Sequence, residues 1–235
     1  MIALDNSDTL HGTYAAVHSK GEAFVPLLNA LALDGMKGHW DFAFGPVHLR
    51  ALAARLSYPI LGINCFKKES NRLVFPPSRV IERGGLRVGI IGIAAVIIDK
   101  GMPPAFCEGV RFTLGRDELP THIARLRDQE QADLIVVLSH LGFAQDMRLA
   151  SEVSGIDVLL SGHTHNRLEK PARVNGAVSS SPAVTVREIE VYPGQPAEWW
   201  FVPIATGRMA DLHGGIAGKD GKTHAALGKV GEIMI

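Results

Sequence analysis

Residues 132–166, ADLIVVLSHLGFAQDMRLASEVSGIDVLLSGHTHN, contain two apolar runs on either side of an amphipathic stretch. Except for Ser139 and Asp157 at their ends, the runs at 134–139 and 157–160 are apolar, which is typical of strands buried on both faces. The stretch 144–155 between them has the spacing of a helix. This order predicts two neighbouring buried strands of a layered α/β domain.

The rest of the chain also alternates between helical and strand patterns. Helical spacing predicts three further helices, over 22–35, 46–59 and 116–131. Strand patterns predict a short buried strand over 59–64, a hairpin over 73–95 about Gly84-Gly85, and a hairpin over 183–204 about Pro193-Gly194. Together these elements predict an α/β fold with a mixed sheet or two sheets.

The composition excludes several classes of protein. The 235 residues carry 24 Lys and Arg against 24 Asp and Glu, so no net field attracts a nucleic-acid polymer or an anionic membrane. No apolar run reaches bilayer length and no signal-peptide pattern is visible, so we expect a cytoplasmic protein, or a periplasmic or extracellular one if the chain is rearranged or a fragment. Cys65 and Cys107 are far apart, which favours two buried free thiols.

Histidines follow both strands of the opening stretch. His140 comes directly after the first strand, and His163 and His165 come shortly after the second. Ligand sites in open α/β sheets lie at the carboxyl ends of strands. One such histidine is more often a surface or core residue, but three on neighbouring strands serve no structural need. In an extended loop His163 and His165 point to one side, which suits one metal or two neighbouring ones, and imidazole with carboxylate suits Zn, Mn, Fe or Ni.

Four segments in a fixed order carry a family resemblance. They are LDNSDTLHGT (4–13), GHWDFAFG (38–45), VVLSHLG (136–142) and LLSGHTHN (159–166). Their order resembles the calcineurin-like metallophosphoesterases, in the 5'-nucleotidase and 2',3'-cyclic phosphodiesterase branch, over residues 1 to about 204. The resemblance implies a four-layer α-β-β-α sandwich with two packed mixed sheets. It also implies two divalent transition-metal ions (Mn, Zn or Fe) and a small nucleotide-type phosphomonoester or cyclic phosphodiester, attacked by a hydroxide that the two metals activate.

The same resemblance implies a set of metal ligands. Asp8 bridges the two metals. His140 and His163 bind one metal, and His165 binds the other. His39 falls at the family's Asn ligand, where imidazole would bind a transition metal more strongly. The loop residues that would orient these ligands, or that only form turns, are Asp5 and Asn166.

The chain departs from the family pattern around the second segment. Trp40 stands where the family has a catalytic His, and Ala43 where it has the Asp that orients that His. Ser7 replaces the Gly before the bridging Asp. Trp40 is interpreted as a core residue, with stacking of a base as the alternative. His11 is interpreted as solvent-facing rather than as a substitute acid, and Asp41 as either a turn carboxylate or a functional one.

The family's first metal also takes ligands from an Asp-x-His segment that precedes the Asp loop. The tail ADLHGG has this form, with Asp211 and His213, and is followed by a Gly-rich loop and a helical pattern over 224–234. We therefore predict a circular permutation within a single domain, 1–235. Residues 205–235 would supply the family's first strand, loop and helix, and the two ends of the chain would lie close together.

Three functions remain open at this point. The first is a metal-dependent hydrolase of phosphate esters. The second is a hydrolase of a sulfur-linked substrate, because the thiosulfohydrolases of sulfur oxidation carry a similar Gly-His-Trp segment. The third is a catalytically weak metal-binding domain, because the His-Asp dyad and the family's C-terminal substrate domain have no counterpart in these residues.

Overall fold

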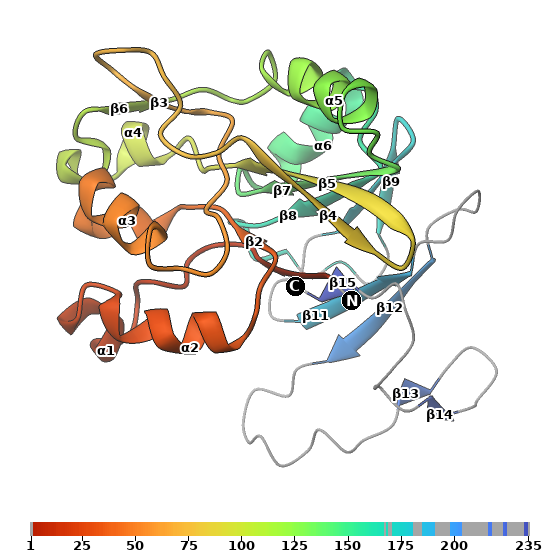
Figure 1. The fold of residues 1–235 in the computed structure, drawn as a ribbon, viewed down its shortest axis with the longest axis horizontal. Coiled ribbons are helices and arrows are strands. Elements are labelled where there is room, and N and C mark those ends of the chain that lie inside the picture. The colour runs from red at the N-terminus through yellow and green to blue at the C-terminus, as the bar shows by residue number, and fades with distance from the viewer. Residues whose placement is uncertain are drawn as a thin grey trace.

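The computed structural model describes residues 2–166, 168 and 171–180, and beyond them the strand backbones 185–190, 198–203, 216–217, 223–224 and 233–234 (Figure 1). Its largest sheet has six strands, in the order β4 (Ser78–Arg83), β5 (Leu86–Ile93), β7 (Leu134–Ser139), β8 (Val158–Ser161), β10 (Ala177–Ser180) and β9 (Ala172–Val174). The four central strands are parallel, and β4 and β9 run antiparallel at the two edges. The sheet is therefore mixed, and the hairpin predicted over 73–95 is its β4–β5 edge.

Successive side chains of the central strands face two different cores. Ile90 of β5 is paired with Val136 of β7, and both belong to the cluster that contains Leu4. The next pair, Ile91 and Val137, belongs to the cluster formed with the helices α5 (Leu119–Asp128) and α6 (Phe143–Glu152). Because both faces are covered, both sets are apolar, which explains the uninterrupted hydrophobic runs.

A second, smaller parallel sheet lies on the face of the large sheet opposite α5 and α6. Its strands are β1 (Ile2–Asp5), β2 (Gly35–Met36) and β15 (Ile233–Met234). The far side of this sheet, around Met36, packs on α2 (Val25–Ala30) and α3 (Pro46–Ala53). The layers thus run helix, sheet, sheet, helix, and the predicted four-layer architecture is confirmed (Figure 1).

Three predicted helices are shorter than expected, among them the one over 116–131, which is α5. The helix predicted over 22–35 is a 3-10 turn (Glu22–Phe24) followed by α2, and it ends because Ala32 has a left-handed φ of 50° and Gly35 joins the sheet. The helix predicted over 46–59 is observed only as α3, which ends at Ala53. The strand predicted over 59–64 forms only one bridge, between Ile60 and Met36. No helix among the described residues has the length and apolarity that a membrane crossing requires.

Short elements complete the described chain. They are the helices α1 (Tyr14–His18) and α4 (Ile98–Gly101), the 3-10 helices Trp40–Phe44 and Pro104–Cys107, and the strands β3 (Cys65–Lys67), β6 (Val110–Phe112), β11 (Thr185–Glu190), β12 (Glu198–Pro203), β13 (Ile216–Ala217) and β14 (Thr223–His224). The hairpin predicted over 183–204 is confirmed by the antiparallel pairing of β11 with β12. Both cysteines are free, but only Cys65 is fully buried.

The helix predicted over 224–234 is wrong where the structure describes it, because His224 lies in β14 and Ile233 in β15. Ile233 pairs in parallel with Ile2. In this register the strand β15 lies beside β1. The predicted helix would instead have ended where β1 begins. The circular permutation stays a prediction, and Asp211 and His213 lie outside the described residues.

Candidate metal centre

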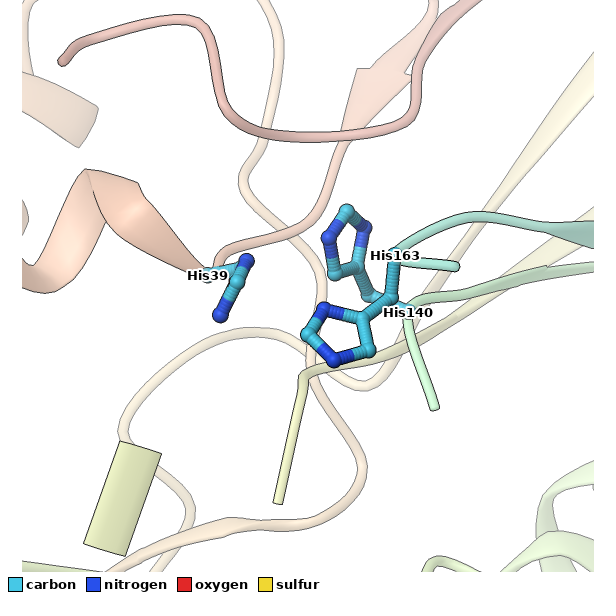
Figure 2. Close-up of side chains that lie close together, drawn as sticks. All are labelled: His39, His140 and His163. Carbon is cyan, nitrogen blue, oxygen red and sulfur yellow. The ribbon is translucent and has the colours of Figure 1, made fainter. Parts of the chain in front are cut away.

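Three histidines meet where strands of the two sheets end. His39 lies shortly after β2, His140 directly after β7, and His163 two residues beyond β8. Their ligand nitrogens lie within 4.8 Å of one another (Figure 2). The carboxyl ends of parallel strands face one edge, so residues distant in sequence reach one point.

Asp8, in the loop after β1, contacts two of the three imidazoles. Its Oδ1 lies 2.9 Å from His39 Nδ1, and its Oδ2 lies 3.2 Å from His140 Nε2. The backbone N–H of Trp40 also donates to Oδ1, at 3.1 Å. Burial raises the pKa of Asp8, but its contacts with His140 and His39 outweigh burial and hold the pKa well below its usual range. The carboxylate is therefore ionised and faces the imidazoles.

The ring of His140 is oriented from its opposite edge. Its Nδ1 lies 2.9 Å from the carbonyl oxygen of Asn6, so its Nε2 faces the carboxylate of Asp8. Among the described residues, the buried Nε2 has no hydrogen-bond partner. Burial lowers the pKa of His140 to about 3 and also lowers that of His163. Neutral imidazoles beside a carboxylate fit a divalent transition metal.

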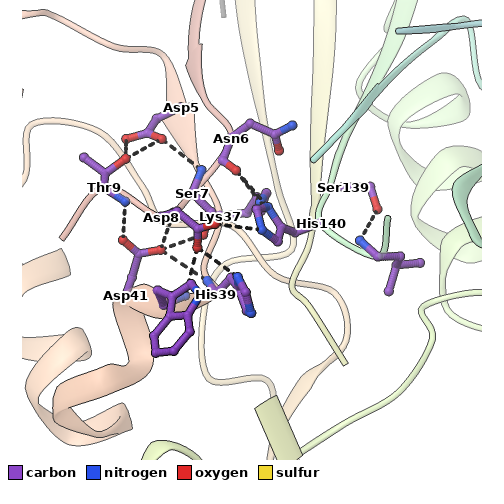
Figure 3. A network of polar contacts seen from close by, with 12 residues as sticks. Asp5, Asn6, Ser7, Asp8, Thr9, Lys37, His39, Asp41, Ser139 and His140 are labelled. Carbon is purple, nitrogen blue, oxygen red and sulfur yellow. Dashed lines mark hydrogen bonds and ion pairs between the residues drawn. The ribbon is translucent and has the colours of Figure 1, made fainter. Parts of the chain in front are cut away.

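Asp41 fixes the loop that carries Asp8. Its carboxylate accepts hydrogen bonds from Ser7 Oγ at 2.6 Å and from the backbone N–H of Thr9 at 3.1 Å (Figure 3). A third bond, of 2.9 Å, comes from the backbone N–H of Leu10. The carboxylate also accepts longer bonds, of 3.2 Å, from the N–H groups of Asp8 and His39. Asp41 is buried, so it is a structural anchor of the site rather than an ordinary turn carboxylate.

The Asp loop explains the departure at Ser7. Ser7 and Asp8 have left-handed φ angles of 77° and 66°, a conformation in which a glycine is the common choice. Ser7 accepts this conformation while its hydroxyl bonds to Asp41. Asp5 supports the same turn through Thr9 Oγ1 at 2.8 Å and the Ser7 N–H at 2.9 Å, and burial raises the pKa of Asp5 to about 6.

Asp146 holds the ends of β7 and β8 together from α6. Its carboxylate accepts a hydrogen bond from Ser139 Oγ at 2.6 Å and from Ser161 Oγ at 2.5 Å. Ser139 directly precedes His140, and Ser161 lies two residues before His163. Burial raises the pKa of Asp146 to about 7. The sequence reasoning missed this residue, although a serine at the end of each buried strand was an available signal.

Lys37 is the second residue that the sequence reasoning missed. It is fully buried, its Nζ donates to the carbonyl oxygen of Asn6 at 2.5 Å, and it contacts Nδ1 of His140. Burial lowers the pKa of Lys37 well below its usual value.

Two predicted site residues lie apart from this group. His165 is exposed and is not among the three clustered histidines, and Asn166 is also exposed. The loop is not extended as expected, because His163 and His165 have φ angles of 77° and 50°. The two imidazoles therefore do not follow the simple alternation of an extended chain.

Trp40 is not a core residue, which corrects the prediction. Its side chain is 39% exposed beside His39, and the ring of His11 stacks on it with centroids 5.1 Å apart. His11 is partly covered by this contact rather than simply facing solvent.

Known proteins share this sequence and fold. The probable 5'-nucleotidase of Treponema pallidum is 29% identical over 169 residues, which cover 70% of this chain and 28% of that protein. The uncharacterized metallophosphoesterase YunD of Bacillus subtilis is 31% identical over 168 residues, covering 68% of this chain and 34% of that protein. The homologues of the chain are 5'-nucleotidases and metallophosphoesterases.

A sulfate thiohydrolase has a similar structure. The sulfate thiohydrolase SoxB of Thermus thermophilus superposes with a TM-score of 0.79 and 26% identity, covering 86% of this chain and 38% of that one. No protein-family model matches the chain. The chain spans about a third or less of the curated metallophosphoesterase relatives named above.

Proposed function

We propose that the centre formed by Asp8, His39, His140 and His163 binds a divalent transition metal and that the protein hydrolyses small phosphate esters. The observation that carries the proposal is the buried Nε2 of His140, which has no hydrogen-bond partner among the described residues and lies 3.2 Å from an ionised carboxylate. Ligand nitrogens of His39, His140 and His163 lie within 4.8 Å of one another at the same point. Buried polar atoms of a purely structural core are normally hydrogen-bonded, so this arrangement indicates a binding site.

The residues of the site perform three tasks in this proposal. Divalent ions, when bound, supply positive charge for the phosphate oxygens and lower the pKa of a water molecule. Asp8 and the neutral imidazoles would bind the ions. The carbonyl oxygen of Asn6 orients His140, and Asp41 holds the loop that carries Asp8. Trp40 offers no proton to a leaving group, so the leaving group departs unprotonated or takes its proton from water.

A second metal would need ligands beyond these four residues. We propose His165, Asp211 and His213, together with a shared Asp8, as that set. Double substitution of Asp211 and His213 by Ala should lower the bound metal from near two to near one per chain, as measured by elemental analysis. An unchanged stoichiometry would remove both residues from the set.

The experiment that tests the function uses the full chain reconstituted with Mn²⁺. Turnover of 4-nitrophenyl phosphate is expected, and it should disappear in His140→Ala but persist in His18→Ala, whose imidazole is exposed on α1. Bound metal without turnover of any phosphate ester would refute the phosphoesterase.

Hydrolysis of a sulfur-linked ester is the second candidate. It is supported by the Gly38-His39-Trp40 segment and by the 26% identity to a sulfate thiohydrolase. Release of sulfate from a thiosulfate conjugate, at a rate above that of phosphate from a phosphate ester, would favour it.

A further inference from the structure

Trp40 places an indole at the edge of the metal centre. Its backbone N–H is bonded to Asp8, and its ring stands edge-on to the ring of His39 with centroids 5.8 Å apart. The side chain remains 39% exposed. A large aromatic surface open to solvent directly beside a polar centre is a feature of binding sites rather than of cores.

The indole is held rigidly by its neighbours. His11 stacks on it with an interplanar angle of 18°, and Phe106 meets it edge-on with centroids 5.9 Å apart. Phe44 packs in turn against His11, at 5.6 Å. The backbone N–H of Trp40 is bonded to Asp8, and the side chain of the adjacent Asp41 is bonded to the Asp loop. An aromatic surface fixed in this way binds a planar group with little loss of conformational entropy.

We propose that Trp40 is the binding surface for a planar, aromatic leaving group of the ester that the metal centre hydrolyses. The inference rests on the proposed function and narrows its substrate class. A general acid usually contributes about 10²–10⁴-fold to such a reaction, and position 40 has none. Aryl esters tolerate that loss, because their leaving group is stable without a proton. Trp40 therefore stands in place of the acid and supplies the stacking surface for a leaving group that needs no acid.

The reaction balances with water as the only co-reactant. A water oxygen forms a bond to phosphorus, and the bond between phosphorus and the aryl oxygen breaks. The electron pair of that bond leaves with the aryl oxygen as an aryloxide, and the proton lost by the water passes to solvent.

A binding measurement tests the surface without relying on turnover. Phenylphosphonate and methylphosphonate are titrated into the Mn²⁺-loaded full chain, and the ratio of their dissociation constants is recorded. Stacking of a ring on an aromatic side chain changes affinity by about 5- to 150-fold, so the phenyl compound should bind more tightly by a factor in this range. Trp40→Ala should bring the ratio close to one, and Trp40→Phe should keep most of it.

A matched control separates the surface from general aromatic contacts. Tyr14→Ala removes another exposed aromatic residue, 84% exposed on α1, and should leave the ratio unchanged. A ratio of one in the unmodified protein, or one unaffected by Trp40→Ala at equal metal content, overturns the inference. If the ratio depends on Trp40 but the protein hydrolyses neither aryl phosphates nor aryl sulfur esters, Trp40 is a binding surface and the proposed hydrolase function is refuted.

Discussion

Ser139 donates a hydrogen bond of 2.6 Å to Asp146, and this contact connects the strand that carries His140 to helix α6. Ser161 makes the equivalent bond from the next strand. The positions of two candidate ligands therefore depend on one buried carboxyl that belongs to neither strand.

Asp146 should make stability depend on pH. Its pKa is about 7 in the folded chain, above the ordinary 3.8, so the folded state retains a proton that the unfolded state releases. The contribution of Asp146 to stability is then complete below about pH 4 and is lost as pH rises towards 7. In urea titrations of metal-free protein, the stability of the unmodified chain relative to Asp146→Asn should fall between pH 5 and 7.5. Asp128→Asn, on the exposed end of α5, is the control, and a difference that does not vary with pH would contradict the prediction.

His39 should be replaceable by the amide that the family uses. His39→Asn keeps a ligand atom near Asp8, whereas His39→Ala removes it. We expect His39→Ala to weaken Mn²⁺ binding by more than the roughly 10- to 100-fold typical of lost outer contacts, and His39→Asn to weaken it less. Isothermal titration with Mn²⁺ measures both, with His18→Ala as the reference. Equal losses in the two variants would show that position 39 is not a ligand.

Gly162 should not tolerate any side chain, because the ring of His140 occupies the space beside it. A Cβ there would lie 2.5 Å from His140 Nδ1 and 3.0 Å from Asn6 Nδ2. Gly162→Ala should therefore displace the imidazole and reduce metal affinity at least about tenfold, a loss typical of disturbed ligand orientation. Gly101→Ala meets its nearest atoms at an ordinary 3.5 Å and should bind metal normally. Unaltered metal affinity in Gly162→Ala would show that His140 does not need its present position.

Asp41→Asn should destabilise the protein by about 3 kcal/mol, because an amide offers only one acceptor oxygen to Ser7 and to the Thr9 and Leu10 N–H groups. Urea unfolding measures this loss. Asp117→Asn, with a side chain 85% exposed, should change stability by less than about 0.5 kcal/mol. A small effect at Asp41 would mean that the Asp loop keeps its shape without the anchor.

The sequence was most informative where pattern and topology agree. Apolar runs covered on both sides predicted β7 and β8, and the strand-end rule brought His140 and His163 to one point. Their role as metal ligands stays a prediction. Helix ends were less predictable, since the left-handed turn at Ala32 has no glycine to mark it.

The supporting residues of the site could not be predicted from local pattern. Asp146 and Lys37 are charged residues in helical or strand-flanking positions, where exposure is the ordinary expectation. Only the tertiary contacts with Ser139 and Asn6 give them a buried role. Asp41 was left open between a turn and a function for the same reason.

The alternation of β7 between two cores also limits how this chain can evolve. Val136 faces one core and Val137 the other, so inserting or deleting one residue in the strand would exchange the two faces. His140 would then turn away from Asp8, while its identity and its neighbours in sequence stayed the same. Substitutions in β7 can accumulate gradually, but a change in its length would remove the centre in a single step.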